Sequence, residues 1–271
     1  LPYLLSYFLQ TLYGMADLFI IGRFRGVDST TAVSVGSQVM HMLTVMLVGL
    51  AMGSTVSIGQ AVGGGDRKRA GRCIGNTVTL FMGLSVVLTG VLLCLTRPIV
   101  ALMSTPAEAV EGTAAYLTIC FLGIPFITAY NIISSIFRGL GDSRSPLIFV
   151  LVACVVNIVG DLALVAGLGL DAAGAAMATV LAQAVSVALA VGMLVKKKLP
   201  FSIRRGDFRL NVQCKKFLSI GLPLALQEFL TQLSFLALCA FVNRLGLAAS
   251  SGYGVASKIV NFAMLIPSAL M

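Results

Sequence analysis

Residues 1–23, LPYLLSYFLQTLYGMADLFIIGR, decide how the rest of the chain is interpreted. This largely apolar run has the length of an α-helix that crosses a bilayer. A single carboxylate, Asp17, interrupts it. Because an acidic residue inside such a helix is energetically costly, its presence predicts a functional site.

Asp17 belongs to a polar face of this predicted helix. Polar side chains recur at spacings of three or four residues, which places them on one side of a helix. They are Tyr3, Ser6, Gln10, Tyr13 and Asp17. The other faces are rich in Leu, Phe and Ile, so we expect a wet cavity on one side of the helix and lipid or protein on the other.

The composition extends this interpretation to the whole chain. It is 58% hydrophobic and 11% charged, with a mean hydropathy of +0.99. Soluble domains are far less apolar, and stretches of about twenty apolar residues recur along the sequence. The fold class predicted is therefore an all-α polytopic membrane protein. The expected spans are 2–24, 33–62, 73–96, 112–137, 146–167, 172–195, 215–245 and 248–271.

The basic residues predict the topology. Fourteen of the 19 Lys and Arg lie in the connections after the second, fourth and sixth spans, and four lie in the other connections. The positive-inside rule then places the N-terminus and the loops after the even-numbered spans in the cytoplasm. We expect the protein in the plasma (inner) membrane. The net charge of +9 is thus a topology signal and an expected contact with the lipid bilayer, and nucleic acid is not expected as a partner.

An internal repeat predicts two lobes. Residues 221–246, GLPLALQEFLTQLSFLALCAFVNRLG, are similar to residues 1–26. Parallel repeats of this kind are typical of transporters built from two six-helix halves. We expect a complete first lobe at 1–195, a basic cytoplasmic linker at 196–214, and the first two helices of a second, truncated lobe at 215–271. The chain is on this view a fragment of a longer protein.

Further polar residues are predicted at the depth of Asp17. Asn157 and Asp161 lie four residues apart on one face of the fifth span, and Asp161 and Asp17 each lie about 9 Å from the outer end of their helices. Thr179 reaches the same level in the sixth span. These oxygen ligands suit Na⁺, or a proton shared by coupled acids. The alternative is a structural hydrogen-bond cluster that holds the helices together.

Other polar and adaptable residues are predicted to line a substrate cavity. Tyr13 continues the stripe of Asp17, Ser37 and Asn131 lie on similar stripes of the second and fourth spans, and Met40 suits an adaptable apolar wall. Pro125 predicts a kink in the fourth span. His41, the only histidine, is either hydrogen-bonded or involved in coupling.

The second lobe does not copy the acid of the first. Glu228 lies five residues after Pro223, but the repeat pairs it with Tyr7, and it pairs Asp17 with Leu238. Glu228 is therefore a candidate for a second-lobe ionisable site or for the cytoplasmic mouth of the protein.

Enzyme chemistry is not expected. No nucleophile–base set and no metal-ligand spacing of His or Cys occurs, and the glycine-rich stretch GGGDRKRAGR lacks the GK[ST] of a phosphate-binding loop. No cofactor is expected beyond Na⁺ or H⁺ as a coupling ion.

Four stretches carry a family resemblance: LYGMADLFIIGRFRG, IGQAVGGGDRKRAGR, YNIISSIFRGLGDSRSP and VVNIVGDLALVAGLGLDAAGAAMAT. Together they resemble the multidrug and toxic compound extrusion (MATE) transporters of the multidrug/oligosaccharidyl-lipid/polysaccharide exporter superfamily. The resemblance implies twelve helices in two lobes, and multidrug efflux of cationic or amphipathic organic compounds (xenobiotic export) by antiport with Na⁺ or H⁺. We expect a monomer.

The resemblance also implies roles for particular residues. The ion or proton site would comprise Asp17, Asn157, Asp161 and Thr179, and the polar pocket would include Gln10, Tyr116 and Asn131. Pro2 would be the point at which the first helix bends. One branch of the family places its second-lobe acid near Thr231, where this chain has no acid. A lipid-linked oligosaccharide or lipid flippase of the same superfamily is the alternative function, although it would need a cationic cavity.

Overall fold

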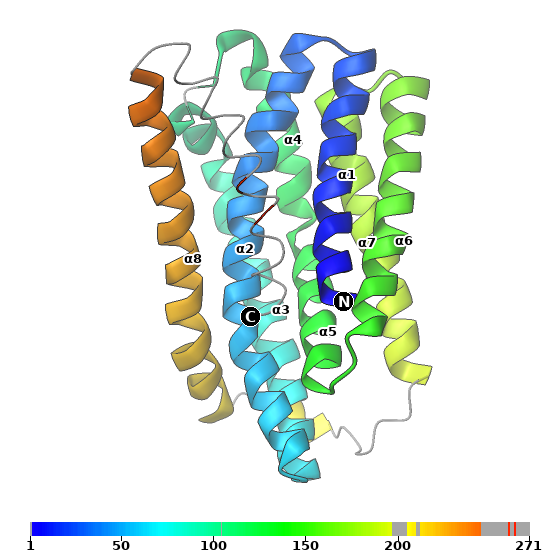
Figure 1. The fold of residues 1–271 in the computed structure, drawn as a ribbon, viewed down its shortest axis with the longest axis vertical. Coiled ribbons are helices and arrows are strands. Elements are labelled where there is room, and N and C mark those ends of the chain that lie inside the picture. Colours follow the sequence, from blue (N-terminus) through cyan, green and yellow to red (C-terminus); the bar gives the residue numbers. More distant parts are fainter. Residues whose placement is uncertain are drawn as a thin grey trace.

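The computed structural model describes residues 2–103, 105–196, 205–209 and 212–244, together with Val260 and Ala263. Within these ranges the chain is a bundle of long helices (Figure 1). The elements are α1 (Pro2–Phe24), α2 (Val27–Gly63), α3 (Arg67–Leu102), η1 (Ala107–Ala109), α4 (Val110–Leu122), α5 (Ile124–Gly139), α6 (Arg144–Asp161), η2 (Leu162–Gly167), α7 (Ala172–Lys196), η3 (Arg205–Phe208) and α8 (Val212–Arg244). The predicted all-α membrane fold is confirmed.

Several of these helices can cross a membrane. By length and hydropathy, α2, α3, the α6–η2 pair and α7 qualify among the described residues. The segment η1–α4 and α5, bent by 48° between them, make a fifth if the two are counted as one span. The bend lies at Gly123, beside the predicted kink at Pro125. The predicted spans at 2–24 and 215–245 correspond to α1 and α8, which run alongside the others (Figure 1) but do not themselves meet this criterion of length and hydropathy. The predicted span at 248–271 lies outside the described residues, apart from two positions.

The helices are longer than the apolar runs that predicted them. Helix α2, which contains the predicted span at 33–62, has 37 residues. Helix α3, which contains the predicted span at 73–96, has 36 residues. At 1.5 Å per residue, α2 is about 55 Å long, whereas the apolar core of a bilayer is about 30 Å thick. Both helices therefore extend beyond the apolar layer into polar surroundings.

Short capped turns join the helices. Asp66 Oδ1 accepts a hydrogen bond from Arg69 N at 3.0 Å and so caps the start of α3. Asp142 does the same for α6, where its Oδ1 accepts from Arg144 N at 3.0 Å and from Ser145 N at 3.1 Å. The turns fix the lengths of the helices and bring each one back into the bundle.

Three groups of buried side chains hold the bundle together. One joins α1, α2, α4 and α7, the second joins α2, α3, α5 and α8, and the third joins α5, α6 and α7. The rings of Phe137 and Phe149 pack edge to face in the third group, with centroids 5.4 Å apart. The exposed faces are also apolar, with Val86 and Val87 of α3 and Val155 and Val159 of α6 more than half exposed. Apolar residues on both sides of a helix are typical of a membrane protein.

The first helix of the predicted second lobe packs closely on the first lobe. Helix α8 lies against α2, where the backbones meet at glycines. A Cβ at Gly53 would lie 2.3 Å from the carbonyl oxygen of Phe217, and one at Gly221 would lie 2.3 Å from that of Leu50. We call this contact, made by Gly49, Leu50, Gly53, Phe217, Gly221 and Ala225, the α2–α8 seam.

The described part of the linker is fastened to α3. Asn76 Nδ2 donates to the carbonyl oxygen of Asp207 in η3 at 3.0 Å, and Thr79 Oγ1 donates to that of Phe208 at 2.9 Å. Cys214 Sγ, near the start of α8, donates to Asn76 Oδ1 at 3.1 Å. Asn76 is fully buried. One side chain of α3 therefore holds both the linker and the first turn of α8. The predicted linker boundary at 214 lies inside α8, which begins at Val212.

Candidate functional site

Two acids meet inside the first lobe. Asp17 lies in the second half of α1, and Asp161 is the last residue of α6. The two helices pack together, and the two carboxyl groups lie within electrostatic range of each other. Asp17 is 7% exposed and Asp161 is 0% exposed. The structure thus brings together two residues that the sequence separates by more than half the length of the chain.

An amide and a hydroxyl complete the set. Asn157 Nδ2 donates to Thr179 Oγ1 at 3.4 Å. Thr179 Oγ1 in turn lies 3.5 Å from Asp17 Oδ2, to which it can donate. The carbonyl oxygen of Ala175, one turn earlier in α7, is the nearer acceptor at 3.0 Å, so the single hydroxyl proton of Thr179 is donated either to it or to Asp17. We call Asp17, Asn157, Asp161 and Thr179 the acidic cluster. Helices α1, α6 and α7 each contribute to it.

Several oxygens of the acidic cluster face no donor. Within the described ranges, Asp17 Oδ1, Asn157 Oδ1 and both carboxyl oxygens of Asp161 are buried and accept no hydrogen bond. Buried polar atoms almost always have a partner. Two adjacent buried carboxylates also need a neutralising charge, because low-polarity surroundings penalise isolated ions. The cluster therefore fits a hard monovalent cation, or a proton shared by the two acids.

The helix that carries Asp161 changes its geometry directly after the acid. Residues Leu162–Gly167 form a π-helix, whereas the sequence predicted a regular span over 146–167. Such π-helical turns are rare and occur often at functional sites. No sequence pattern marks a π-helix, so this feature could not be predicted.

The residues predicted to line a cavity divide into two groups. Tyr13 and Tyr116 lie near Asp17. Tyr116 is 3% exposed, and its ring packs directly on Gly36 of α2. Met40 is buried in the same apolar core as Tyr116. Tyr13 and Tyr116 therefore lie beside the acidic cluster, whereas Met40 is placed only in the apolar core that contains Tyr116.

The other predicted cavity residues bond to their own helices or face outward. Asn131 Nδ2 donates to the carbonyl oxygen of Ile127 at 2.8 Å, and Ser37 Oγ donates to that of Ser34 at 3.0 Å. Gln10 is exposed on α1. The structure does not gather these three side chains with the acidic cluster.

The remaining predicted positions lie elsewhere. Glu228 is half-buried on α8, three residues after Ala225 of the α2–α8 seam. His41 is exposed on α2, within electrostatic range of Glu228. Pro2 is the first residue of α1, and its side chain is outside the described part of the structure.

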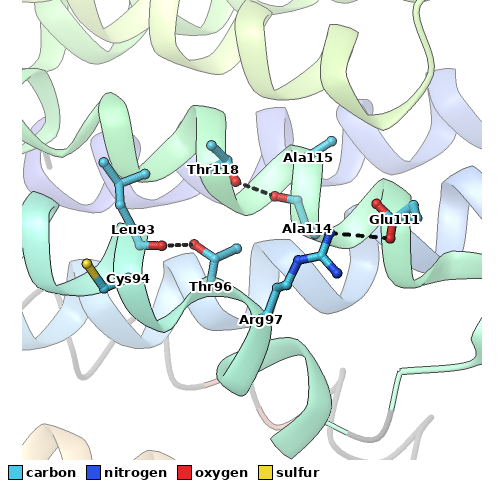
Figure 2. A pocket seen from close by; sticks show the side chains of 8 residues that line it. All are labelled: Leu93, Cys94, Thr96, Arg97, Glu111, Ala114, Ala115 and Thr118. Carbon is cyan, nitrogen blue, oxygen red and sulfur yellow. Dashed lines mark hydrogen bonds and ion pairs between the residues drawn. The ribbon is translucent and has the colours of Figure 1, made fainter.

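A separate cavity opens between α3 and α4 (Figure 2). It has a volume of about 420 Å³. Arg97 Nη2 lies 3.7 Å from Glu111 Oε1 at its rim, and both side chains are more than 80% exposed. The hydroxyls of Thr96 and Thr118 bond to backbone carbonyls of their own helices. None of the predicted site residues lines this cavity, so it adds nothing to the acidic cluster.

Fold and cluster together define a class: a multi-pass helical membrane protein with a pair of acids buried inside one lobe. Comparison with known proteins places the chain within that class. The MatE family model matches residues 2–163, more than half of the chain, and the chain belongs to this family.

Relatives and solved structures agree with this assignment. The chain is 30% identical to the probable multidrug resistance protein YoeA of Bacillus subtilis, over 97% of this chain and 59% of that protein. It resembles a solved outward-facing conformation of a multidrug resistance MATE family transporter of the MOP superfamily, with a TM-score of 0.88 and 26% identity, covering 97% of this chain and 58% of that one. An inward-facing conformation gives a TM-score of 0.82 at 25% identity, covering 95% and 59%. The chain thus spans about 59% of the length of these proteins.

Proposed function

We propose that the protein is a secondary antiporter that exports cationic or amphipathic organic compounds in exchange for Na⁺ or H⁺. One observation carries this proposal: two buried acids, Asp17 and Asp161, approach each other from different helices, with oxygens that face no donor among the described residues. A permanent structural cluster would satisfy those oxygens. A site that takes up and releases a cation needs them available.

The position of the acidic cluster suggests how ion binding is coupled to movement. Its oxygens come from α1, α6 and α7, so neutralising them draws three helices together and releasing the ion lets α1 separate from α6. The family's outward-facing and inward-facing structures support alternating access, in which two lobes rock against each other. The α2–α8 seam is the place where α8 would transmit such rocking to the first lobe.

The rest of the proposal concerns cargo and location. The interior of the lobe carries acids and neutral polar groups near Asp17, which favours cationic cargo over the pyrophosphate of a lipid-linked sugar. We propose further that the protein lies in the plasma membrane as a monomer. The distribution of its basic residues supports a cytoplasmic N-terminus.

Gradient-driven efflux by the full-length protein in vesicles tests the proposal. The variant Asp17→Asn keeps the size of the side chain but removes its charge, and we expect it to reach the membrane and to lose coupled efflux. The matched control is Glu111→Gln, because Glu111 is an exposed acid remote from the cluster. Normal efflux by Asp17→Asn would refute the proposal, and replacing Na⁺ by choline at constant pH separates Na⁺ coupling from H⁺ coupling.

A further inference from the structure

Arg25 ties the end of α1 to the end of the α6–η2 segment. Its Nε and Nη2 atoms both donate to the carbonyl oxygen of Val165, at 3.0 Å and 2.7 Å. The Nε atom also lies 3.7 Å from Asp171 Oδ1, at the start of α7. The Arg25 side chain is 24% exposed, and Val165 is fully buried. One guanidinium thus contacts the segments that follow Asp161 and precede α7.

The π-helical turn makes the carbonyl of Val165 available. In this turn Leu168 N bonds to the carbonyl oxygen of Ala163 at 2.9 Å, and Leu170 N bonds to that of Leu164 at 3.0 Å. The carbonyl of Val165 then accepts from Arg25. The last carbonyls of a helix lack helical partners and carry partial negative charge, so a guanidinium binds well there.

The loop between η2 and α7 leaves room for this contact. Gly169 has φ +79°, a conformation that side chains larger than glycine rarely adopt. A Cβ on Gly169 would lie 2.8 Å from Arg25 Nη2. Glycine at this position therefore lets the guanidinium pass close to the backbone on its way to Val165.

The contact joins the two segments that carry the acids. Arg25 comes eight residues after Asp17, and Val165 comes four residues, about one helical turn, after Asp161. We propose that Arg25 is a positioning residue, which holds the ends of α1 and η2 together and so sets the separation of Asp17 and Asp161 for ion binding. The inference rests on the proposed antiport function and adds a residue that touches neither the ion nor the cargo.

A merely structural role would give a different result from a positioning role. If Arg25 only stabilised the fold, its loss would lower the amount of folded protein. Efflux by the protein that still folds would then depend on ion concentration as in the wild type. If Arg25 sets the spacing of the acids, its loss changes the ion concentration at which efflux is half-maximal. The decisive measurement is therefore the apparent ion affinity, determined separately from the maximal efflux rate and from the cargo affinity.

The experiment compares full-length variants in vesicles. We expect Arg25→Ala to raise the half-maximal Na⁺ or H⁺ concentration about tenfold, as for the loss of a charge-assisted hydrogen bond, with cargo affinity unchanged. Arg25→Lys keeps the charge without the paired donors and should lie between Arg25→Ala and the wild type. Gly169→Ala should shift the ion dependence in the same direction, because its Cβ displaces the guanidinium. Arg23→Ala is the matched control, since Arg23 is exposed two residues earlier.

The outcomes separate this inference from the proposed function. Wild-type ion dependence in both Arg25→Ala and Gly169→Ala would overturn the positioning role, and so would reduced efflux with unchanged ion dependence. If Arg25→Ala does not fold, Arg25→Lys and Gly169→Ala decide the question. Asp17→Asn is measured in parallel. If Asp17→Asn keeps coupled efflux, the proposed function is refuted. If Asp17→Asn loses efflux and Arg25→Ala has the ion dependence of the wild type, only the positioning role is refuted.

Discussion

The hydroxyl of Thr179 lies 3.5 Å from Oδ2 of Asp17 and links α7 to α1 inside the bundle. The same hydroxyl accepts from Asn157 Nδ2, so it also connects the acid of α1 to the helix of Asp161. Thr179 is thus the neutral residue whose hydroxyl contacts polar side chains of both α1 and α6.

Replacing Thr179 tests this link. Thr179→Val keeps the shape of the side chain but removes the hydroxyl, and we expect it to weaken apparent ion affinity by about 1–1.5 kcal/mol, or roughly tenfold. Thr179→Ser keeps the hydroxyl and should stay within about twofold of the wild type. Half-maximal ion concentrations for efflux provide the measurement. Equal values for the Val and Ser variants would show that the hydroxyl plays no part.

The α2–α8 seam makes a prediction about stability. Alanine at Gly53 or Gly221 would place a Cβ 2.3 Å from a backbone oxygen of the opposite helix, so the helices must move apart. Overpacking of this kind lowers the free energy of unfolding by about 1–3 kcal/mol. Gly90→Ala on α3 is the matched control, because a Cβ there meets nothing within 4 Å. Thermal unfolding in detergent compares the variants, and a Gly53→Ala protein as stable as Gly90→Ala would contradict the close contact.

The hydrogen bonds of Asn76 lead to a prediction about the stability of the linker. Asn76→Leu keeps a similar volume but removes the bonds to Asp207 and Cys214. We expect faster amide hydrogen exchange at residues 205–208 and in the first turn of α8, with the centre of α5 unchanged. Gln60→Ala serves as the control, because it removes an exposed contact with Lys216. Unchanged exchange at 205–208 would mean that Asn76 does not hold the linker in place.

Much of the fold was predictable because apolar runs of membrane length set the number and order of the helices. Their ends were not predictable from hydropathy, since α2 and α3 continue as helix beyond the apolar layer. The break in the fourth span was predicted from Pro125, and it falls at Gly123, directly before α5 begins. The repeat predicted that α8 starts a second lobe, but not that glycines would bring it into backbone contact with α2.

The meeting of Asp17 and Asp161 was predicted by counting residues from the ends of two helices, since depth along a helix is a matter of rise per residue. Arg25 was counted only in the distribution of basic residues. Its partner is the backbone carbonyl of Val165, which the π-helical turn leaves without a helical partner. A contact with a backbone atom cannot be predicted from the spacing of side chains. Asn131 and Ser37 share the spacing of a polar stripe, but their side chains bond to the preceding turn of their own helices.

Equilibrium ion binding by the purified full-length protein tests the central claim most directly. Binding of radioactive Na⁺, and proton release at constant ionic strength, would be measured for the wild type, Asp17→Asn, Asp161→Asn and the double variant. We predict that the wild type binds one of these ions and that each single variant loses binding as completely as the double variant, because the two acids act as one site. Wild-type binding in both single variants would contradict the account.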